Sequence, residues 1–244
     1  MSRYYYDLHI HSCLSPCAEN DNTPNNVAGM AKLSGLDIVA LTDHNAVRNC
    51  PAFFEAAERY ELTPIAGMEL TTSEDIHVIC LFEHLSDALI FGDEIDKRRI
   101  SVKNRPDIFG DQLILDGEDN VIGTEPDLLS VATDISVEDV SDLVLRYGGI
   151  CYPAHIDRDS NGIIAVLGTL PDSLGFRAVE FRDGENIPKY AERYDLSNLL
   201  TLTNSDAHFL TGIRDKDAYL DLPDGLSSAE EVRSELFKLL RGEL

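Results

Sequence analysis

The stretch DLHIHS, residues 7 to 12, places His9 and His11 one residue apart, directly after a run that begins with three tyrosines. The run has the character of a β-strand that ends at these histidines. In a strand, residues i and i+2 point to the same face of the sheet. Two imidazoles are therefore expected side by side at the end of a first strand. An isolated pair of this kind is usually an ordinary polar pair on a solvated strand, so its meaning depends on the rest of the chain.

The composition is that of an ordinary soluble globular protein, with 43% hydrophobic and 26% charged residues in a chain of 244. This length suits one large domain, and we expect residues 1–244 to form a single domain. The sequence shows neither a charged-then-apolar leader nor an apolar run of about 18 residues, so we expect a cytoplasmic protein without membrane contact. Five scattered cysteines form no disulfide framework, which agrees with a reducing compartment. The oligomeric state is left open.

The net charge of −24 arises from 44 acidic and 20 basic residues. Such a surface repels nucleic-acid backbones and anionic membranes. We therefore expect no nucleic-acid polymer as a partner. A small anionic substrate requires local positive charge, which metal ions can provide because they are often the largest charges in a site.

Short apolar runs alternate with helical patterns along the chain, and several runs are nearly continuous in apolar residues, as in strands covered on both faces. The seven predicted strands are residues 4–9, 36–42, 64–69, 76–82, 150–154, 177–182 and 199–203. Seven strands with intervening helices predict an α/β fold, a distorted seven-stranded (β/α)7 barrel. Only six residues separate Glu69 from Ile76, too few for a helical crossover. Strand 76–82 is therefore expected to run antiparallel to its predecessor.

Helices are predicted between the strands, several of them with recognisable caps such as Thr23 before Pro24 and Ser228 with Glu231. The predicted helices are residues 24–34, 51–61, 85–99, 136–148, 188–198 and 228–240. Residues 100–135 are less regular and rich in turn sequences such as DGEDN. We expect this segment to be an insertion over the barrel mouth.

Histidines and acids gather where the predicted strands begin or end. In chain order these residues are His9, His11, Asp43, His44, Glu69, His77, His155, Asp206 and His208, and they include six of the seven histidines. In barrels of this class the C-terminal ends of the strands carry function. Imidazole and carboxylate are the ligands of zinc, manganese and iron. The pattern therefore predicts a metal site at the C-terminal mouth of the barrel.

The motifs DLHIHS, TDHN, GMEL, HVICLF, PAH and SDAH, in this order, closely resemble those of the PHP (polymerase and histidinol phosphatase) family of metal-dependent phosphoesterases. The resemblance covers nearly the whole chain and implies two to three divalent metal ions (Zn, Mn or Fe). It implies that the first metal is held by His9, His11, Glu69 and Asp206. The implied ligands of the second are Glu69, His77 and His155, with Glu69 as the bridge, and those of the third include His44 and His208.

The chain departs from the family pattern at one place. Many members follow the histidine pair with SDG, whose Asp completes the third site, whereas this chain reads SPCAENDNTP. Counting back from Pro24 aligns Glu19 with that Asp. We take Glu19 as the remaining ligand of the third metal, with Asp21 as the alternative and the thiolate of Cys17 as a more remote one.

The catalytic roles follow from the chemistry of such a site. Two metals can generate a nucleophilic hydroxide near neutral pH for in-line attack on phosphorus. Asp43 is expected to orient a ligand rather than bind metal, and His44, His208 or a metal-bound water is expected to protonate the leaving oxygen. Arg158, three residues beyond His155, is the best-placed cation for a phosphate. Weaker candidates are Arg99, Lys103 and Arg105.

The leading hypothesis is a phosphomonoesterase that acts on a small phosphorylated metabolite or nucleotide. A nucleotide phosphodiesterase is the second enzymatic alternative. Metal-dependent C–N hydrolysis on a similar barrel is a third and is disfavoured by the ordered motifs. A non-catalytic metal-binding scaffold or sensor is the alternative outside the enzymes.

Overall fold

The structure is a computed structural model that describes residues 1–243. The ten strands in this part of the chain are β1 (Ser2–Ile10), β2 (Ile38–Leu41), β3 (Thr63–Thr71), β4 (His77–Phe82), β5 (Leu113–Leu115), β6 (Val121–Thr124), β7 (Ile150–Pro153), β8 (Ala178–Phe181), β9 (Leu200–Thr203) and β10 (Tyr219–Leu222). The seven strands expected from the apolar runs are all present. β5, β6 and β10 are additional.

Eight α-helices lie in the same residues: α1 (Pro24–Leu33), α2 (Cys50–Arg59), α3 (Leu85–Ile95), α4 (Pro106–Phe109), α5 (Val137–Arg146), α6 (Ile163–Leu167), α7 (Ile187–Ala191) and α8 (Ala229–Leu240). The helix expected at 188–198 is wrong beyond its first turn, because α7 ends at Ala191. Asp195 instead accepts hydrogen bonds from the backbone N–H and the hydroxyl of Ser197, at 3.0 and 2.6 Å. Such local side-chain bonds offer the backbone an alternative to the helix.

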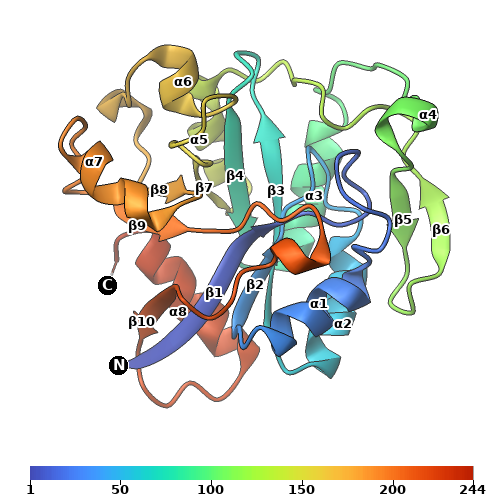
Figure 1. Cartoon of the computed structure of the whole chain (residues 1–244), viewed down its shortest axis with the longest axis horizontal. Helices are drawn as coiled ribbons and strands as arrows, with labels where there is room; N and C mark the ends of the chain where they lie inside the picture. The colour runs from blue at the N-terminus through green and yellow to red at the C-terminus, as the bar shows by residue number, and fades with distance from the viewer. Residues whose placement is uncertain (244) are drawn as a thin grey trace.

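Six strands form one curved sheet in the order β10-β1-β2-β3-β4-β7 (Figure 1). β1, β2 and β3 run parallel, whereas β4 is antiparallel to both β3 and β7. The antiparallel direction of β4 confirms the expectation from the short connection that precedes it. Thr71 pairs with His77 in this ladder, so the end of β3 and the start of β4 lie at the same edge of the sheet.

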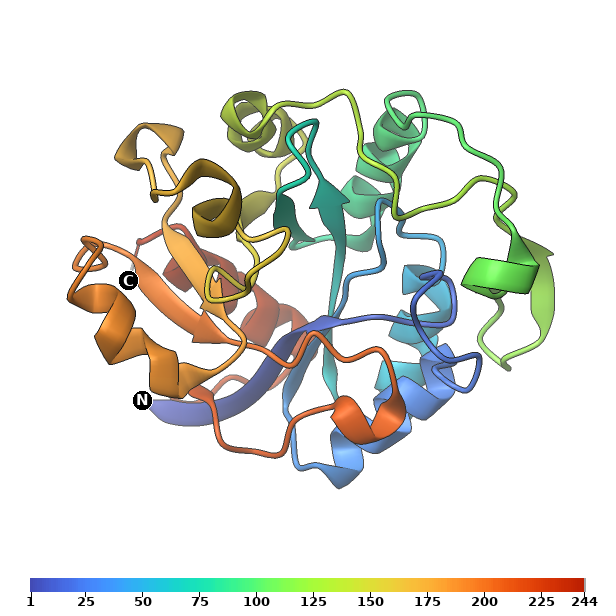
Figure 2. The same ribbon diagram turned by 45° about the horizontal axis from the view of Figure 1, so that its top comes forward.

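β8 and β9 form a separate parallel pair between β7 and β1 (Figures 1 and 2). The α/β fold is confirmed, but residues 1–243 do not form one closed seven-stranded ladder. On the β7 side, a backbone hydrogen bond links the segment after β7 to β8, because the Ile156 N–H donates to the Glu180 carbonyl at 2.8 Å. On the β1 side, the Asn204 side-chain oxygen accepts from the Leu8 N–H at 2.8 Å. A side chain thus replaces a backbone partner where the expected barrel would close.

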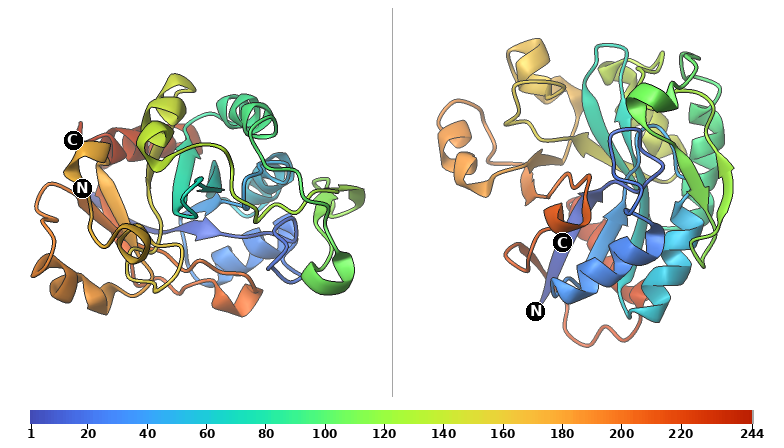
Figure 3. Two further views of the ribbon diagram at one scale, coloured as in Figure 1. Left: turned by 90° about the horizontal axis from the view of Figure 1, so that it is seen from above. Right: turned by 45° about the vertical axis from the view of Figure 1, so that its right-hand side comes forward.

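Both faces of the sheet are buried because neighbouring residues of β2 enter different cores. Ile38 and Ala40 pack in an inner core with Phe237 of α8, whereas Val39 and Leu41 pack in an outer core. The outer core contains residues of α1, α2, α3 and α5, which surround the sheet (Figure 3, left). Figure 1 places α8 near the beginnings of the strands. Apolar side chains therefore cover both faces of the sheet up to the rim where β1, β2 and β3 end.

Residues 100–135 contain α4 and the β5–β6 hairpin, which lie to one side of the main sheet (Figure 3, right). The loop after β2 holds this segment. Asn45 Nδ2 donates to the carbonyls of Leu129 and Val131 in this segment, at 2.7 and 3.0 Å. Asn49 Nδ2 donates to the Leu113 carbonyl at 3.0 Å. Because this loop also carries His44, the segment is anchored beside the rim. Within residues 1–243, none of the helices has the length and apolar character needed to cross a bilayer.

Candidate metal centre

The rim brings eight of the nine proposed ligands into one cluster. Seven of them form three overlapping groups in which the candidate ligand atoms lie within 4.8 Å of one another. The groups are His9, His11, Glu69 and Asp206; His44, Glu69 and His77; and His11, His44 and His208. His155 joins the cluster through Glu69, whose Oε1 lies 2.9 Å from its Nε2.

Glu69 stands at the middle of this cluster, which we call the metal centre. Its Oε1 lies 2.7 Å from His77 Nδ1 and 2.9 Å from His155 Nε2. Its Oε2 lies 3.1 Å from His44 Nδ1 and 3.3 Å from His11 Nε2. The carboxylate is almost fully buried. Each oxygen therefore faces a different set of imidazoles, which is the arrangement of a bridging ligand.

Several atoms of the metal centre are buried without a hydrogen-bond partner. They are His44 Nδ1, Glu69 Oε2, His77 Nδ1, His155 Nδ1 and Asp206 Oδ1. Buried polar atoms are nearly always paired, and an unpaired one costs about 1–3 kcal/mol. Imidazole nitrogens and carboxylate oxygens that converge, several of them without a hydrogen bond, are the donor set of a divalent transition metal. These residues therefore fit one or more such ions.

The two kinds of ligand shift each other's pKa values. Burial opposes ionisation of Glu69, but the imidazoles of His77, His9 and His44 hold its pKa well below the usual value. Burial also opposes protonation of His11, yet the neighbouring carboxylates of Asp206 and Glu69 raise its pKa to about 9. Burial lowers the pKa of His44 well below its usual value. Glu69 is thus ionised and His44 neutral, as a metal ion requires, whereas His11 must release its proton when a metal binds.

Asp43 does not enter the ligand groups but supports one of the ligands. Its carboxylate accepts from the Ser12 N–H and hydroxyl at 2.7 and 2.6 Å, and from the Ser15 hydroxyl at 2.7 Å. The Ser15 oxygen also lies 2.9 Å from His11 Nδ1. Asp43 therefore holds Ser15, and Ser15 holds the ring of His11. This is the arrangement of an orienting residue behind a ligand.

Two arginines meet at the far oxygen of Asp206. Arg158 and Arg182 each donate to Asp206 Oδ2, at 2.7 and 3.1 Å, and their side chains are 36% and 50% exposed. The other oxygen, Oδ1, faces His9 and His11 at 3.4 and 3.3 Å. The guanidinium groups therefore lie beside the metal centre and remain accessible from outside. Arg182 is the cation that sequence reasoning missed.

The structure does not bring Glu19 into any of the three ligand groups. Its side chain is exposed, and its backbone N–H donates to the His208 carbonyl at 2.9 Å. Asp21 is also exposed. Part of Cys17 is exposed at the rim. Desolvation of its thiol by neighbouring residues and the nearby Glu69 carboxylate raise the pKa of that thiol to about 12. Without a metal ion nearby, this thiol is therefore protonated.

Glu180 is a buried acid beside the metal centre that sequence reasoning overlooked. It is a fully buried acid in the apolar strand β8, and its Oε1 lies 2.8 Å from His9 Nδ1. The only sign of Glu180 in the sequence was that it is a single acid within the apolar stretch AVEF. Strand periodicity alone did not show that this side chain points toward the histidines.

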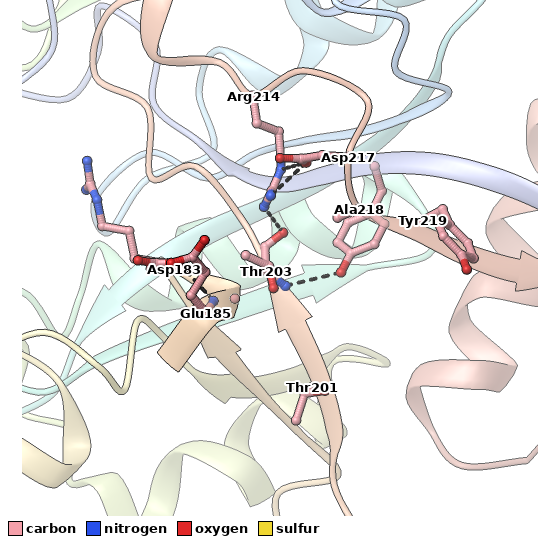
Figure 4. Close-up of a pocket in the computed structure, with 11 residues that line it drawn as sticks. Asp183, Glu185, Thr201, Thr203, Arg214, Asp217, Ala218 and Tyr219 are labelled. Carbon is pink, nitrogen blue, oxygen red and sulfur yellow. Dashed lines mark hydrogen bonds and ion pairs between the residues drawn. The ribbon is translucent and has the colours of Figure 1, made fainter. Parts of the chain in front are cut away.

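A polar cavity of about 620 Å³ lies beside β9 (Figure 4). Its lining includes Arg182, Thr203, Arg214 and Asp217. Arg214 is already paired with Asp217 at 2.7 Å and donates to the Thr203 carbonyl. Arg182 lines this cavity and also donates from its guanidinium to Asp206.

The sheet and the cluster at its rim together define an α/β protein with a candidate metal centre. Residues 7–90 match the model of the PHP domain. The resemblance of the motifs to the PHP family of metal-dependent phosphoesterases is thereby confirmed.

Two known sequences are similar to part of this chain. DNA polymerase III PolC-type of Thermotoga maritima is 33% identical over 87 residues, which are 36% of this chain and 6% of that protein. An uncharacterized protein of Methanocaldococcus jannaschii is 30% identical over 84 residues, which are 31% of this chain and 48% of that protein. The matches thus span less than half the length of either relative.

Solved structures share the fold over almost the whole chain. Endonuclease Q of Pyrococcus furiosus matches with a TM-score of 0.68 and 19% identity, over 99% of this chain and 56% of that chain. A protein of Bifidobacterium adolescentis assigned as a metal-dependent phosphoesterase matches with a TM-score of 0.58 and 18% identity, over 96% of each chain.

The expectation that excluded nucleic-acid polymers is wrong. Endonuclease Q bound to a 27-mer duplex with an abasic lesion at its active site matches this chain with a TM-score of 0.68 and 18% identity. A net charge is a sum over the whole surface, whereas binding at a mouth depends on the local charge. Arg158 and Arg182 lie beside the metal centre in spite of the overall charge of −24. The total charge therefore does not exclude a DNA or RNA substrate.

Proposed function

We propose that this protein hydrolyses a phosphomonoester of a small metabolite or nucleotide at the metal centre. The observation that carries the proposal is the position of Glu69, one buried carboxylate whose two oxygens face different imidazoles. A bridge of this kind suits two divalent ions held close together. We further propose that the seven strands around the centre, β1 to β4 and β7 to β9, correspond to a distorted seven-stranded barrel.

The proposed ligands divide among two to three divalent ions of zinc, manganese or iron. The first set is His9, His11, Glu69 and Asp206, which also form one of the compact groups. The second set is Glu69, His77 and His155. The third set is His44, His208 and Glu19, and Glu19 is retained because its backbone already contacts the His208 carbonyl.

Bound metal ions would supply an activated water near neutral pH and positive charge opposite the phosphate oxygens. Arg158 and Arg182 are placed to bind the phosphate from the open side, because their planar guanidinium groups match its oxygens. His208 is fixed by a 2.8 Å contact between its Nδ1 and the Asp206 carbonyl, which leaves Nε2 free. We assign proton donation to the leaving oxygen to water at the third site, or to His208 or His44 when that imidazole does not hold a metal, and the orientation of His11 to Asp43.

The cavity beside Arg182 suits the organic part of such a substrate, since the same arginine lines the cavity and contacts the metal centre. A phosphodiester within a nucleic acid is the second candidate substrate. It is favoured by the fold shared with Endonuclease Q and by the accessibility of both arginines.

The proposal is tested by measuring metal content and phosphate release in parallel. The purified protein is analysed for zinc, manganese and iron, and then assayed with nucleoside monophosphates, sugar phosphates and histidinol phosphate. A DNA duplex with an abasic site and a cyclic nucleotide test the diester alternative, and N-acyl substrates test C–N hydrolysis. His77→Ala is compared with His84→Ala, since His84 is an exposed histidine away from the centre.

We expect at least two equivalents of metal and turnover of a monoester. His77→Ala should lose turnover and the second metal, whereas His84→Ala should keep both metals and turnover. Turnover of the duplex alone would move the assignment to a nuclease. Bound metal without turnover of any substrate would favour a metal-binding scaffold, and an absence of metal uptake would overturn the proposal.

A further inference from the structure

Glu180 lies in the middle of β8, is fully buried, and has no role among the proposed ligands. Its Oε1 lies 2.8 Å from His9 Nδ1 and also accepts from the backbone N–H of His155 at 3.1 Å. Its Oε2 accepts from Asn204 Nδ2 at 2.7 Å. One carboxylate thus contacts residues assigned to two different metals.

The contact with His9 determines which nitrogen of the ring can bind a metal. His9 Nδ1 is occupied by Glu180, while His9 Nε2 faces Glu69 and Asp206 at 3.5 and 3.4 Å. A carboxylate behind a ligating histidine fixes the tautomer and the ring orientation, and it raises the basicity of the ligating nitrogen. Glu180 therefore directs the Nε2 lone pair of His9 into the metal centre.

The contact with His155 acts on the backbone. His155 has φ of +28°, in a region that a non-glycine residue adopts only under constraint from its surroundings. Both the side chain and the main chain of Glu180 supply that constraint. The carboxylate accepts from the His155 N–H, and the Glu180 carbonyl accepts from the Ile156 N–H at 2.8 Å.

Asn204 completes the arrangement by connecting Glu180 to β1. Its Nδ2 donates to Glu180, while its Oδ1 accepts from the Leu8 N–H at 2.8 Å. Leu8 immediately precedes His9. The same carboxylate is thereby linked to the His9 segment through both the imidazole and the backbone.

We propose that Glu180 is a positioning residue whose negative charge, together with its hydrogen bonds, sets the affinity of the metal centre by holding His9 and His155. This inference rests on the metal centre of the proposed function. It concerns how the ligands are held, and it does not depend on which phosphate ester is the substrate.

A charge exchange between Glu180 and Asn204 separates the charge from the hydrogen bonds. In Glu180→Gln alone, the new amide cannot satisfy both Asn204 and the two donors at Oε1. In the double variant Glu180→Gln with Asn204→Asp, the Gln amide can donate to the new Asp, which can still accept from the Leu8 N–H. The buried charge and the number of hydrogen bonds are kept, but the charge no longer contacts His9.

Three readouts are compared in the wild type and the variants. They are thermal unfolding of the metal-free protein, the Kd for Zn²⁺ by competition with a chromophoric chelator, and the visible spectrum of the Co²⁺ form. Glu125→Gln is the matched control, because Glu125 is a buried carboxylate that pairs with Arg48 and Arg99 away from the metal centre.

We expect the double variant to recover the thermal stability lost in Glu180→Gln while binding Zn²⁺ about 10- to 100-fold more weakly than the wild type. We expect the control to bind Zn²⁺ like the wild type. Wild-type affinity in the double variant would overturn the inference and leave Glu180 a structural role. Failure of the wild type to bind Zn²⁺, Mn²⁺ and Fe²⁺ alike would instead refute the proposed function.

A second measurement does not depend on whether the variants fold. In the Zn²⁺-loaded wild type, the ¹⁵N shifts of His9 should show a protonated Nδ1 and a metal-bound Nε2. Coordination through Nδ1 would overturn the inference, because Glu180 occupies that atom in the structure.

Discussion

Replacing Glu69 by Gln changes the residue that two of the three ligand groups share. The side chain keeps its shape but loses its charge, and one of its oxygens becomes an NH₂ group. In the present arrangement, that group would face either His77 and His155 or His44 and His11, at the distances of 2.7 to 3.3 Å now measured from the carboxylate. An amide nitrogen is not a metal ligand, so at least one metal should be lost.

The size of the effect follows from linkage between binding and folding. A ligand at about 100 times its Kd stabilises the folded state by about 2.7 kcal/mol per site. For a domain of about this size, each kcal/mol corresponds to a change in Tm of about 2–4 °C. Loss of one metal should therefore remove about 5–11 °C of the increase in Tm that metal produces, and loss of two metals about twice that amount.

The assay is thermal unfolding with excess Zn²⁺ or Mn²⁺ and again with EDTA, so that each variant serves as its own reference. Glu125→Gln controls for the loss of a buried carboxylate away from the metal centre. The control should lose stability under both conditions but keep the full increase produced by metal. If Glu69→Gln also keeps the full increase, Glu69 is not a metal ligand and the assignment of the bridge is refuted.

Three further predictions concern pH, a supporting residue and the sheet. Burial opposes protonation of His9 and His11, but nearby carboxylates raise the pKa of His9 well above 6.5 and that of His11 to about 9. A raised pKa in the folded state adds to the free energy of unfolding fully below about pH 6.5, and this contribution is lost as the pH rises through about 9. Tm of the EDTA-treated protein should therefore fall over this range, while Tm of the metal-loaded protein stays level. Asp43→Ala leaves the buried Ser12 N–H without its acceptor, which should cost about 1–3 kcal/mol in a denaturant titration and weaken Zn²⁺ binding about 10-fold; an unchanged Kd would contradict the orienting role. Gly67→Ala should destabilise the fold by about 1–3 kcal/mol, because its Cβ would lie 2.6 Å from the Cys80 carbonyl oxygen; a stability equal to the wild type would contradict the close approach of β3 and β4.

The strands and most of the metal centre could be predicted because each depends on local sequence. An apolar run followed by a polar residue marks where a strand ends, and parallel strands end at one rim. The short connection after Glu69 was enough to place His77 at that rim through an antiparallel strand. Asp43 could be assigned a supporting role because it stands next to His44 in the chain.

The remaining features depend on contacts between distant residues. The side-chain bridge from Asn204 to Leu8 replaces a backbone contact of the expected barrel, and His155 after β7 has a positive φ. Neither feature has a local sequence pattern. Glu180 was missed because an acid within an apolar strand can face a core, a ligand or solvent. Glu19 was chosen by counting residues across a departure from the family pattern, and counting does not determine the path of a loop.

The pairing of β1 with β10 has a consequence for synthesis of the protein. Tyr5 is paired with Tyr219, and the candidate ligands extend from His9 to His208. During translation, the first two histidines leave the ribosome long before the last acid and histidine are made. Contacts this distant in sequence are slow to form, because the loop-closure entropy must be overcome first. The nascent chain therefore carries an incomplete centre, and full metal uptake becomes a late event that reports completion of the fold.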